Sequence, residues 1–209
     1  MLTGGDPNSP AAMLPLILLW LAWCGLHSLL ITITVRRWIE KKGGLWIGCY
    51  RLGYVLIALA TLAPLLWYTR SLPQQSLGVS SLWLLSGQCV LFIYAAVMFI
   101  GGLRAYDLSA FLGIRQWQDF RAGRKGSPAP FRQSGILRYI RHPWYSGGIA
   151  LLWSLPNLTD VSLVVRAILT GYLICGTLLE ERKLKADLGE AYLAYIRRVP
   201  MLFPWKPRH

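Results

Sequence analysis

The sequence predicts an all-α, polytopic integral membrane protein with about five transmembrane helices, the last two forming a helical hairpin, plus helices at the cytoplasmic interface. Of its 209 residues, 55% are hydrophobic and only 15% are charged. Runs of about 18 or more weakly charged residues are typical of membrane-spanning helices. The length favours a single domain over residues 1–209, with a flexible N-terminus at residues 1–11.

Five apolar runs define the expected spans. In chain order they are Ala12–Val35, Leu45–Tyr68, Leu82–Leu103, Trp144–Leu155 and Val161–Leu179. The first three spans therefore occupy residues 12–103. The fourth is short because Pro156 and Asn157 interrupt it, and we expect it to form the hairpin with the fifth.

The segment at residues 104–140 is expected to lie on the cytoplasmic side. Apolar residues recur at helical spacing within Leu103–Phe120, which predicts an amphipathic helix in the interface, weakened by Gly113. The Gly- and Pro-rich residues 121–130 are expected to form a mobile loop. After the last span, the apolar spacing in Glu180–Arg198 predicts that the chain continues as a helix.

The formal net charge of +13 indicates a membrane topology rather than nucleic-acid binding. Lys and Arg follow the first span, fill residues 104–141 and follow the fifth span, whereas the opposite side receives Arg70 and at most Arg166. Because Lys and Arg favour cytoplasmic loops, we expect the N-terminus outside and the C-terminus in the cytoplasm. The lipid bilayer is thus the expected partner. The four cysteines show neither metal-ligand spacing nor a disulfide framework, so no metal site is expected.

Each of the first two apolar spans contains one ionisable side chain. His27 lies in the first span and Arg51 near the cytoplasmic end of the second. Ionisable groups inside a membrane are costly and often functional. The alternatives are a neutral histidine bonded to a carbonyl, and an arginine whose side chain extends to the lipid headgroups.

A second set of polar and aromatic residues lies at the two ends of the predicted hairpin. Arg138, Tyr139, Arg141 and His142 precede Pro143, which fits the first turn of a helix. Trp144 and Tyr145 follow, and Glu180 and Glu181 end the fifth span. Carboxylates, aromatic rings and cations together suit a cationic nucleoside ligand with a carboxylate, such as S-adenosylmethionine. The alternative is a solvated acid pair neutralised by Arg182 and Lys183.

These residues carry a resemblance. Arg141-His142-Pro143-Trp144-Tyr145-Ser146-Gly147 resembles the R-H-P-x-Y-x-G signature of the isoprenylcysteine carboxyl methyltransferase and phospholipid methyltransferase superfamily. Its second block is matched by Glu180-Glu181, by Leu188-Gly189-Glu190-Ala191-Tyr192-Leu193-Ala194-Tyr195, and by Val199-Pro200. The resemblance implies a membrane enzyme that binds S-adenosylmethionine on the cytoplasmic side, through the C-terminal region at residues 141–209. The implied binding residues are Arg141, His142, Tyr145, Glu180 and Glu181. Tyr139, Pro143 and Gly147, from the same stretch, are further candidates for this cofactor site.

The first half of the chain resembles a narrower group. Leu26-His27-Ser28-Leu29-Leu30, Tyr50-Arg51-Leu52-Gly53-Tyr54 and Phe111-Leu112-Gly113-Ile114-Arg115-Gln116 are similar to segments of methanethiol S-methyltransferases and related denitrification-cluster membrane proteins. The resemblance implies a bacterial inner-membrane enzyme that methylates a small or lipophilic acceptor, with a thiol as the best candidate. A thiol needs a nearby cation or base to raise its thiolate fraction. His27, Arg51 and Arg115 are the catalytic candidates for that role.

Other functions stay open. Methylation of a prenylcysteine carboxylate or a phospholipid amine is one alternative, although the arginines that precede the acid pair in prenylcysteine enzymes are replaced here by Cys175–Leu179. A membrane NADPH-dependent reductase is another, although sterol reductases usually have Gly-Glu where this chain has Gly147-Gly148. A non-catalytic membrane subunit is the third. The sequence also leaves the oligomeric state open.

Overall fold

The computed structural model describes residues 10–78, 81–124, 131 and 133–204, which form helices and connections but no β-strand. The helices are α1 (Pro10–Ile31), α2 (Ile33–Lys42), α3 (Leu45–Ser71), α4 (Leu82–Ala105), α5 (Leu108–Leu112), α6 (Ile114–Arg121), the 3-10 helix η1 (Gly135–Arg138), α7 (Pro143–Ser154), α8 (Asp160–Leu188) and α9 (Glu190–Arg198). The all-α prediction is confirmed. Most of the predicted N-terminal tail and most of the predicted loop at 121–130 lie outside the described residues.

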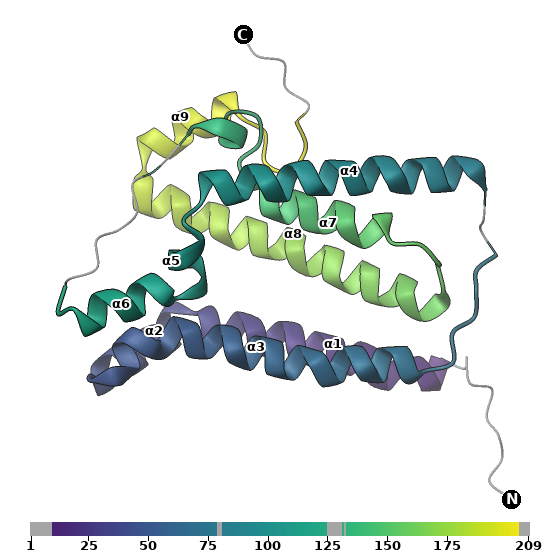
Figure 1. Ribbon diagram of the computed structural model, residues 1–209, viewed down its shortest axis with the longest axis horizontal. Coiled ribbons are helices and arrows are strands. Elements are labelled where there is room, and N and C mark those ends of the chain that lie inside the picture. Colours follow the sequence, from purple (N-terminus) through teal and green to yellow (C-terminus); the bar gives the residue numbers. More distant parts are fainter. Residues whose placement is uncertain (1–9, 79–80, 125–130, 132, 205–209) are drawn as a thin grey trace, which may run out of the picture. The chain divides into compact units, whose positions relative to one another are not determined.

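The chain divides into two compact units. The first contains α1, α2, α3, α5 and α6, and the second contains α4, η1, α7, α8 and α9. In the first unit, α1 and α3 run side by side (Figure 1). The indole Nε1 of Trp20 on α1 donates to the hydroxyl of Thr69 on α3 at 3.1 Å, which joins the two helices.

The first apolar helix ends earlier than predicted. The Thr32 hydroxyl donates to the Leu29 carbonyl at 2.8 Å and accepts from the Val35 N–H at 3.4 Å. A threonine side chain that bonds local backbone groups in this way competes with the helix. The helix therefore stops before Thr32 and α2 starts after it, so the predicted span Ala12–Val35 is too long at its C-terminal end.

The predicted amphipathic helix Leu103–Phe120 is not one helix, because α4 extends to Ala105 and the remainder forms α5 and α6. Gly113 separates these two with φ 88°, a left-handed conformation that favours glycine. A Cβ atom at Gly113 would lie only 2.5 Å from the backbone nitrogen of Leu52. The glycine therefore lets this turn approach the backbone of α3.

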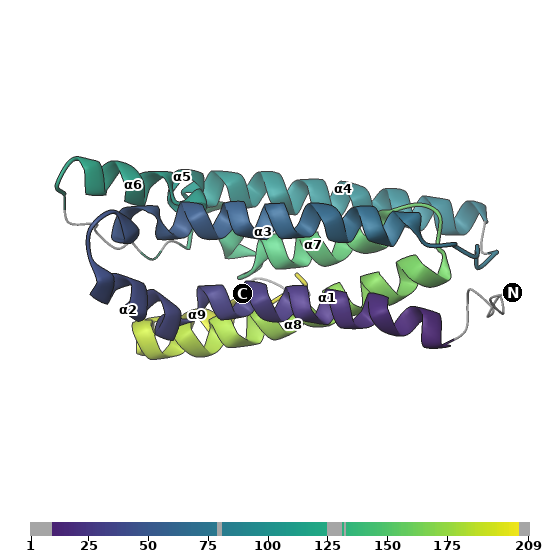
Figure 2. The same ribbon diagram turned by 90° about the horizontal axis from the view of Figure 1, so that it is seen from below.

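In the second unit, α4 lies alongside α7, with α8 packed on α7 (Figures 1 and 2). Small residues permit the close packing of α4 on α7. A Cβ atom at Gly102 would lie 2.1 Å from the Trp144 indole nitrogen, and one at Gly147 would lie 3.0 Å from the Cβ of Met98. The Tyr94 and Ser146 hydroxyls form a 2.7 Å hydrogen bond between the same helices. The start of α7 is thereby fixed against α4.

Four of the helices are long and apolar enough to cross a membrane: Met13–Ile31, Gly48–Ser71, Leu82–Ala105 and Asp160–Leu188. The predicted count of five spans is not confirmed. With 12 residues, α7 is shorter than the roughly 20 residues that a single crossing needs. It begins at Pro143, as predicted, and ends before Pro156, which cannot continue a helix.

The last long helix does not end at the acid pair. It continues through Glu180 and Glu181 to Leu188, where Gly189 (φ 55°) separates it from α9. The predicted helix Glu180–Arg198 is therefore two segments: the end of α8 and the separate α9. Tyr192 and Tyr195 on α9 are buried, which fixes α9 against the rest of the second unit.

Candidate functional site

The candidate site lies in the second unit, where the segment between η1 and α7 meets the end of α9. The backbone N–H of Arg141 donates to the Pro200 carbonyl at 3.0 Å, and that of His142 donates to the Met201 carbonyl at 3.2 Å. Two segments about 60 residues apart in sequence are thus held side by side. The two motifs of the sequence analysis therefore meet in one place.

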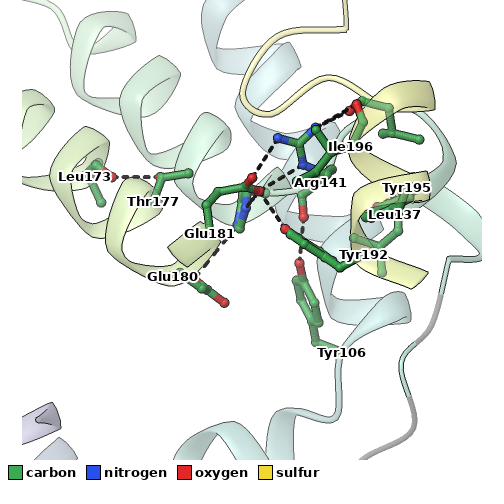
Figure 3. A network of polar contacts seen from close by, with 12 residues as sticks. Tyr106, Leu137, Arg141, Leu173, Thr177, Glu180, Glu181, Tyr192, Tyr195 and Ile196 are labelled. Carbon is green, nitrogen blue, oxygen red and sulfur yellow. Dashed lines mark hydrogen bonds and ion pairs between the residues drawn. The ribbon is translucent and has the colours of Figure 1, made fainter. Parts of the chain in front are cut away.

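Glu181 is the centre of a buried network (Figure 3). Arg141 donates from Nε to Oε1 and from Nη2 to Oε2, both at 2.9 Å, which makes the ion pair bidentate. The Oε1 atom also accepts from the Tyr192 hydroxyl at 2.6 Å and bonds His142 Nε2 at 2.7 Å. Arg141, His142 and Glu181 are each less than a tenth exposed. Breaking such a buried pair on one side leaves a charge without compensation, which is strongly destabilising.

The arginine also holds the end of α9. Its Nη1 donates to the Val199 carbonyl and, at 3.5 Å, to the Ile196 carbonyl. Carbonyl groups in the last turn of a helix lack helical partners, and a cation there also interacts favourably with the helix dipole. On the other side, the Tyr106 hydroxyl donates to the Arg141 carbonyl at 3.4 Å. One guanidinium thus connects α8, α9 and the start of α7.

The tyrosines around the network stay protonated. Burial, and then the hydrogen bond to Glu181, raise the pKa of Tyr192 well above its usual range, so its hydroxyl remains a donor. Burial also raises the pKa of Tyr195 to about 12, and its hydroxyl donates to the Leu137 carbonyl at 2.5 Å. Burial and the negative charge of Glu180 raise the pKa of Tyr106. These three tyrosine hydroxyls therefore remain hydrogen-bond donors at physiological pH.

The two acids of the pair have different surroundings. The Glu181 carboxylate is buried and bonded to three side chains, whereas the Glu180 side chain is 44% exposed. The nearest Glu180 oxygen lies 3.9 Å from His142 Nδ1. Because Nε2 of His142 faces the Glu181 carboxylate, this nitrogen is the donor and fixes the ring orientation. Glu180 is therefore the acid that a cationic ligand can reach.

Tyr145 completes the group on α7. Its ring stands edge-on to the His142 ring, with centroids 5.8 Å apart. A Cβ atom at Gly176 on α8 would lie 3.2 Å from Cε1 of Tyr145, so the glycine makes room for the ring. The structure thus brings Arg141, His142 and Tyr145 together with the acid pair.

Other predicted binding residues lie elsewhere. Tyr139 is half-exposed and lines a separate groove against α4. Pro143 is buried at the first position of α7, and Gly147 faces α4. Tyr192 belongs to one of the matched motifs but was not among the predicted binding residues. The signal that could have placed it is the Tyr-x-x-Tyr spacing, which puts Tyr192 and Tyr195 on one helical face.

The three catalytic candidates lie in the first unit. The Tyr54 hydroxyl bonds His27 Nε2 at 2.6 Å, and the Trp23 ring stacks on the His27 ring with centroids 5.3 Å apart. Arg51 donates from Nε to the Phe111 carbonyl at 2.8 Å, and its guanidinium lies 5.7 Å from the Phe111 ring centroid. Arg51 therefore connects α3 to α5.

Arg115 pairs with Asp107 through a 2.7 Å contact between Nη1 and Oδ2. Asp107 also caps α5, because its Oδ1 accepts from the Ala110 N–H at 3.0 Å and from the Ser109 hydroxyl at 2.7 Å. These hydrogen bonds, followed by that from Arg115, hold the pKa of Asp107 well below its usual range. Arg51 and Arg115 thus both contact α5 or its N-terminal cap, Arg51 through Phe111 and Arg115 through Asp107.

Comparison with known proteins gives three kinds of relative. A family model described as "NnrU protein" matches residues 15–199. Methanethiol S-methyltransferase 2 of Bradyrhizobium diazoefficiens is 31% identical over 210 residues, which is 96% of this chain and 76% of the relative. Methanethiol S-methyltransferase of Mycobacterium tuberculosis is 29% identical over 189 residues, 88% and 74% of the two chains. Nurim of Bos taurus is 27% identical over 167 residues, 74% and 61%. No solved structure matches the chain.

Proposed function

The chain belongs to the NnrU protein family, and from that premise we propose that it is a membrane methyltransferase that uses S-adenosylmethionine to methylate a small thiol. The observation that carries the proposal is the difference between Glu180 and Glu181. One carboxylate is committed to a buried network, and its neighbour is exposed beside aromatic side chains. The name of the methanethiol S-methyltransferase relatives supports both the reaction and the acceptor class.

The residues present fit the proposed methyl donor. S-Adenosylmethionine supplies, when bound, an electrophilic methyl group on a positively charged sulfur. An exposed carboxylate at Glu180 suits the cationic groups of such a ligand, and the neighbouring Tyr145 ring suits either a cation or a base. Glu181 would act through Arg141 and His142, by fixing their orientation. Pro143 and Gly147 would fix the start of α7 without holding charge, and Tyr139 lies outside this region, in the groove against α4.

The acceptor half requires a different chemistry. A free thiol has a pKa near 8.5, so at neutral pH only a small fraction is thiolate. We assign the thiol proton to His27, whose ring is oriented by Tyr54 and Trp23. Arg51 and Arg115 would favour the anion, because together with Asp107 they leave a net positive charge.

The proposed transfer forms one bond and breaks one bond. A bond forms between the acceptor sulfur and the methyl carbon, and the bond between that carbon and the donor sulfur breaks with its electron pair. The positive charge of the donor and the negative charge of the thiolate disappear together. A site that excludes water favours such a loss of charge, and orientation provides much of the remaining acceleration.

The proposal includes a membrane arrangement. We propose that the chain lies in a bacterial inner membrane with its N-terminus outside and its C-terminus in the cytoplasm, as the distribution of Lys and Arg favours. In this arrangement α7 and α8 form the hairpin, and α7 enters the bilayer beside α4. The donor region around Glu180 then faces the cytoplasm. An impermeant thiol reagent should fail to label a cysteine introduced at Gly123 in intact cells, and ready labelling there contradicts the orientation.

Binding of the product S-adenosylhomocysteine to the purified chain tests the donor. Glu180→Gln should weaken binding by about ten- to a hundredfold, which is the usual effect of losing one charged contact. The matched change Asp187→Asn removes an acid from the same helix outside the network and should leave binding unchanged. Equal affinities in the parent and Glu180→Gln would overturn the assignment. NADPH titrated in parallel should not bind, which separates a methyltransferase from a reductase.

A further inference from the structure

A groove of about 410 Å³ lies at the C-terminal end of α4, outside the network around Glu181. One wall is formed by Val97, Ile100, Gly101 and Arg104 of α4. These positions are three, four and seven residues apart, so they share one face of the helix. Over those seven residues the helix rises about 10 Å, and its surface changes from apolar to cationic.

The opposite wall is η1 and the residues next to it. Ile136 is the apolar part, and Ser134 and Tyr139, two residues that carry hydroxyl groups, line the same groove. Gly101 allows this wall to approach, because a Cβ atom there would lie 2.9 Å from the Cβ of Ile136. The groove therefore has two parts. We call Val97, Ile100 and Ile136 its apolar floor, and Arg104, Ser134 and Tyr139, with one cation and two hydroxyl groups, its lip.

The polarity of the groove follows the expected position of α4 in a bilayer. Val97 and Ile100 lie within a candidate membrane span, and Arg104 lies in its last turn. Val97 and Ile100 are half-exposed, as lipid-facing residues would be. The last turn of a span lies at the level of the headgroups, where cations and tyrosines are enriched. The cation and hydroxyls are thus at phosphate depth and the apolar floor at acyl-chain depth.

We propose that this groove binds one anionic phospholipid, with its phosphate at Arg104, Ser134 and Tyr139 and one acyl chain along Val97 and Ile100. Charge complementarity selects this occupant, because the lip carries a cation and hydroxyl donors but, among its lining residues, no carboxylate. The volume falls within the roughly 300–1,000 Å³ of small-molecule sites. It suits a headgroup phosphate and the first part of a chain, while the remainder of the lipid lies along α4.

The groove is connected through η1 to the network around Glu181. Residues lining the groove belong to η1, and the carbonyl of Leu137 in η1 accepts the hydrogen bond from buried Tyr195. Arg141 follows three residues after the end of η1. An occupied groove therefore stabilises the segment that positions Arg141. This role is separate from methyl transfer and needs no methyl donor.

Native mass spectrometry of the purified full-length chain in dodecyl maltoside tests the proposal. Dioleoyl phosphatidylglycerol should bind one copy at least about tenfold more tightly than dioleoyl phosphatidylcholine. Arg104→Gln should lose about tenfold in phosphatidylglycerol affinity, since one charged hydrogen-bonding partner is removed. Arg121→Gln makes the same charge change at an exposed residue outside the groove and should retain the parent affinity.

A second variant tests the apolar floor without a change of charge. Ile100→Trp fills the groove from a half-exposed position and should weaken phosphatidylglycerol binding, whereas Leu85→Trp, at the other end of α4, should not. Glycerol 3-phosphate at millimolar concentration should not displace the lipid, which distinguishes a lipid site from a phosphate site. Equal binding of the two lipids, equal losses in Arg104→Gln and Arg121→Gln, or displacement by glycerol 3-phosphate would each overturn the proposal.

Discussion

The two polar clusters of the protein contain similar residues in opposite surroundings. In the second unit, Arg141 and Glu181 form a bidentate pair with side chains less than a tenth exposed. In the first unit, Arg115 and Asp107 form a pair of similar length with side chains about 40% exposed. A buried pair that loses one member retains a charge without solvent, whereas a surface pair is replaced by water. Similar contacts should therefore have very different consequences for stability.

The same change in the two clusters should produce the largest contrast. Glu181→Gln should destabilise the protein by about 3 kcal/mol, because the buried Arg141 guanidinium loses its counter-charge. Asp107→Asn, the matched change at the surface pair, should leave the thermal midpoint nearly unchanged. Thermal unfolding of both variants in the same detergent measures this. Equal shifts in the two variants would show that burial does not distinguish the clusters.

Two tyrosine hydroxyls on α9 allow a finer comparison, because one donates to a charged acceptor and the other to a neutral one. Tyr192→Phe should cost about 1.5–3 kcal/mol, because its acceptor is the charged Glu181 carboxylate. Tyr195→Phe should cost about 0.5–1.5 kcal/mol, because its acceptor is the neutral Leu137 carbonyl. Denaturation of the two variants gives the comparison. A larger loss in Tyr195→Phe would contradict the central position of Glu181.

The sequence predicted that Arg141, His142 and the acid pair share one site, but it could not assign the depth of each side chain. Glu180 and Glu181 are adjacent, and no pattern in the chain indicated that only one is buried. That difference depends on the break at Gly189, which returns α9 to α8 and places Tyr192 against Glu181. The contact joins residues brought together by tertiary folding, which local spacing does not encode.

The helices themselves were easier to predict. Long apolar runs predicted α3 and α4 to within a few residues, because hydropathy over a span is a strong local signal. The errors occurred where a helix is interrupted by local hydrogen bonds at Thr32, by a close backbone approach at Gly113, and by a glycine with positive φ at Gly189. The paired arrangement of Arg115 with Asp107 was also missed, since an acid eight residues away in a non-helical turn has no fixed spacing.

In the first unit, the pH dependence of turnover should reveal whether Arg51 acts on the acceptor. Arg51→Leu should lower the rate with a small thiol by on the order of tenfold near pH 7, where thiolate is scarce, and the deficit should shrink as pH approaches about 9. Arg70→Leu, at the other end of α3, is the matched control and should retain the parent profile. Parallel profiles for Arg51→Leu and the parent would assign Arg51 a purely structural role.

The smallest expected effect concerns the surface pair at low pH. The pKa of Asp107 is lowered in the folded protein, so its stabilising contribution is complete above the ordinary aspartate pKa and is lost as pH falls below it. Hydrogen exchange of α5 should therefore be slower in the parent than in Asp107→Asn by a constant factor from pH 7 to 5. The difference should shrink below about pH 4. A constant difference down to pH 2 would contradict an ionised cap.

Transfer of a labelled methyl group from S-adenosylmethionine to methanethiol by the purified protein is the most direct test of the proposed activity. The parent should release labelled dimethyl sulfide, and Glu180→Gln should lower the rate at limiting donor by about ten- to a hundredfold. Asp187→Asn should match the parent. If the folded parent transfers no label to the thiol, or if Glu180→Gln matches the parent at limiting donor, the proposed donor site and its chemistry are contradicted.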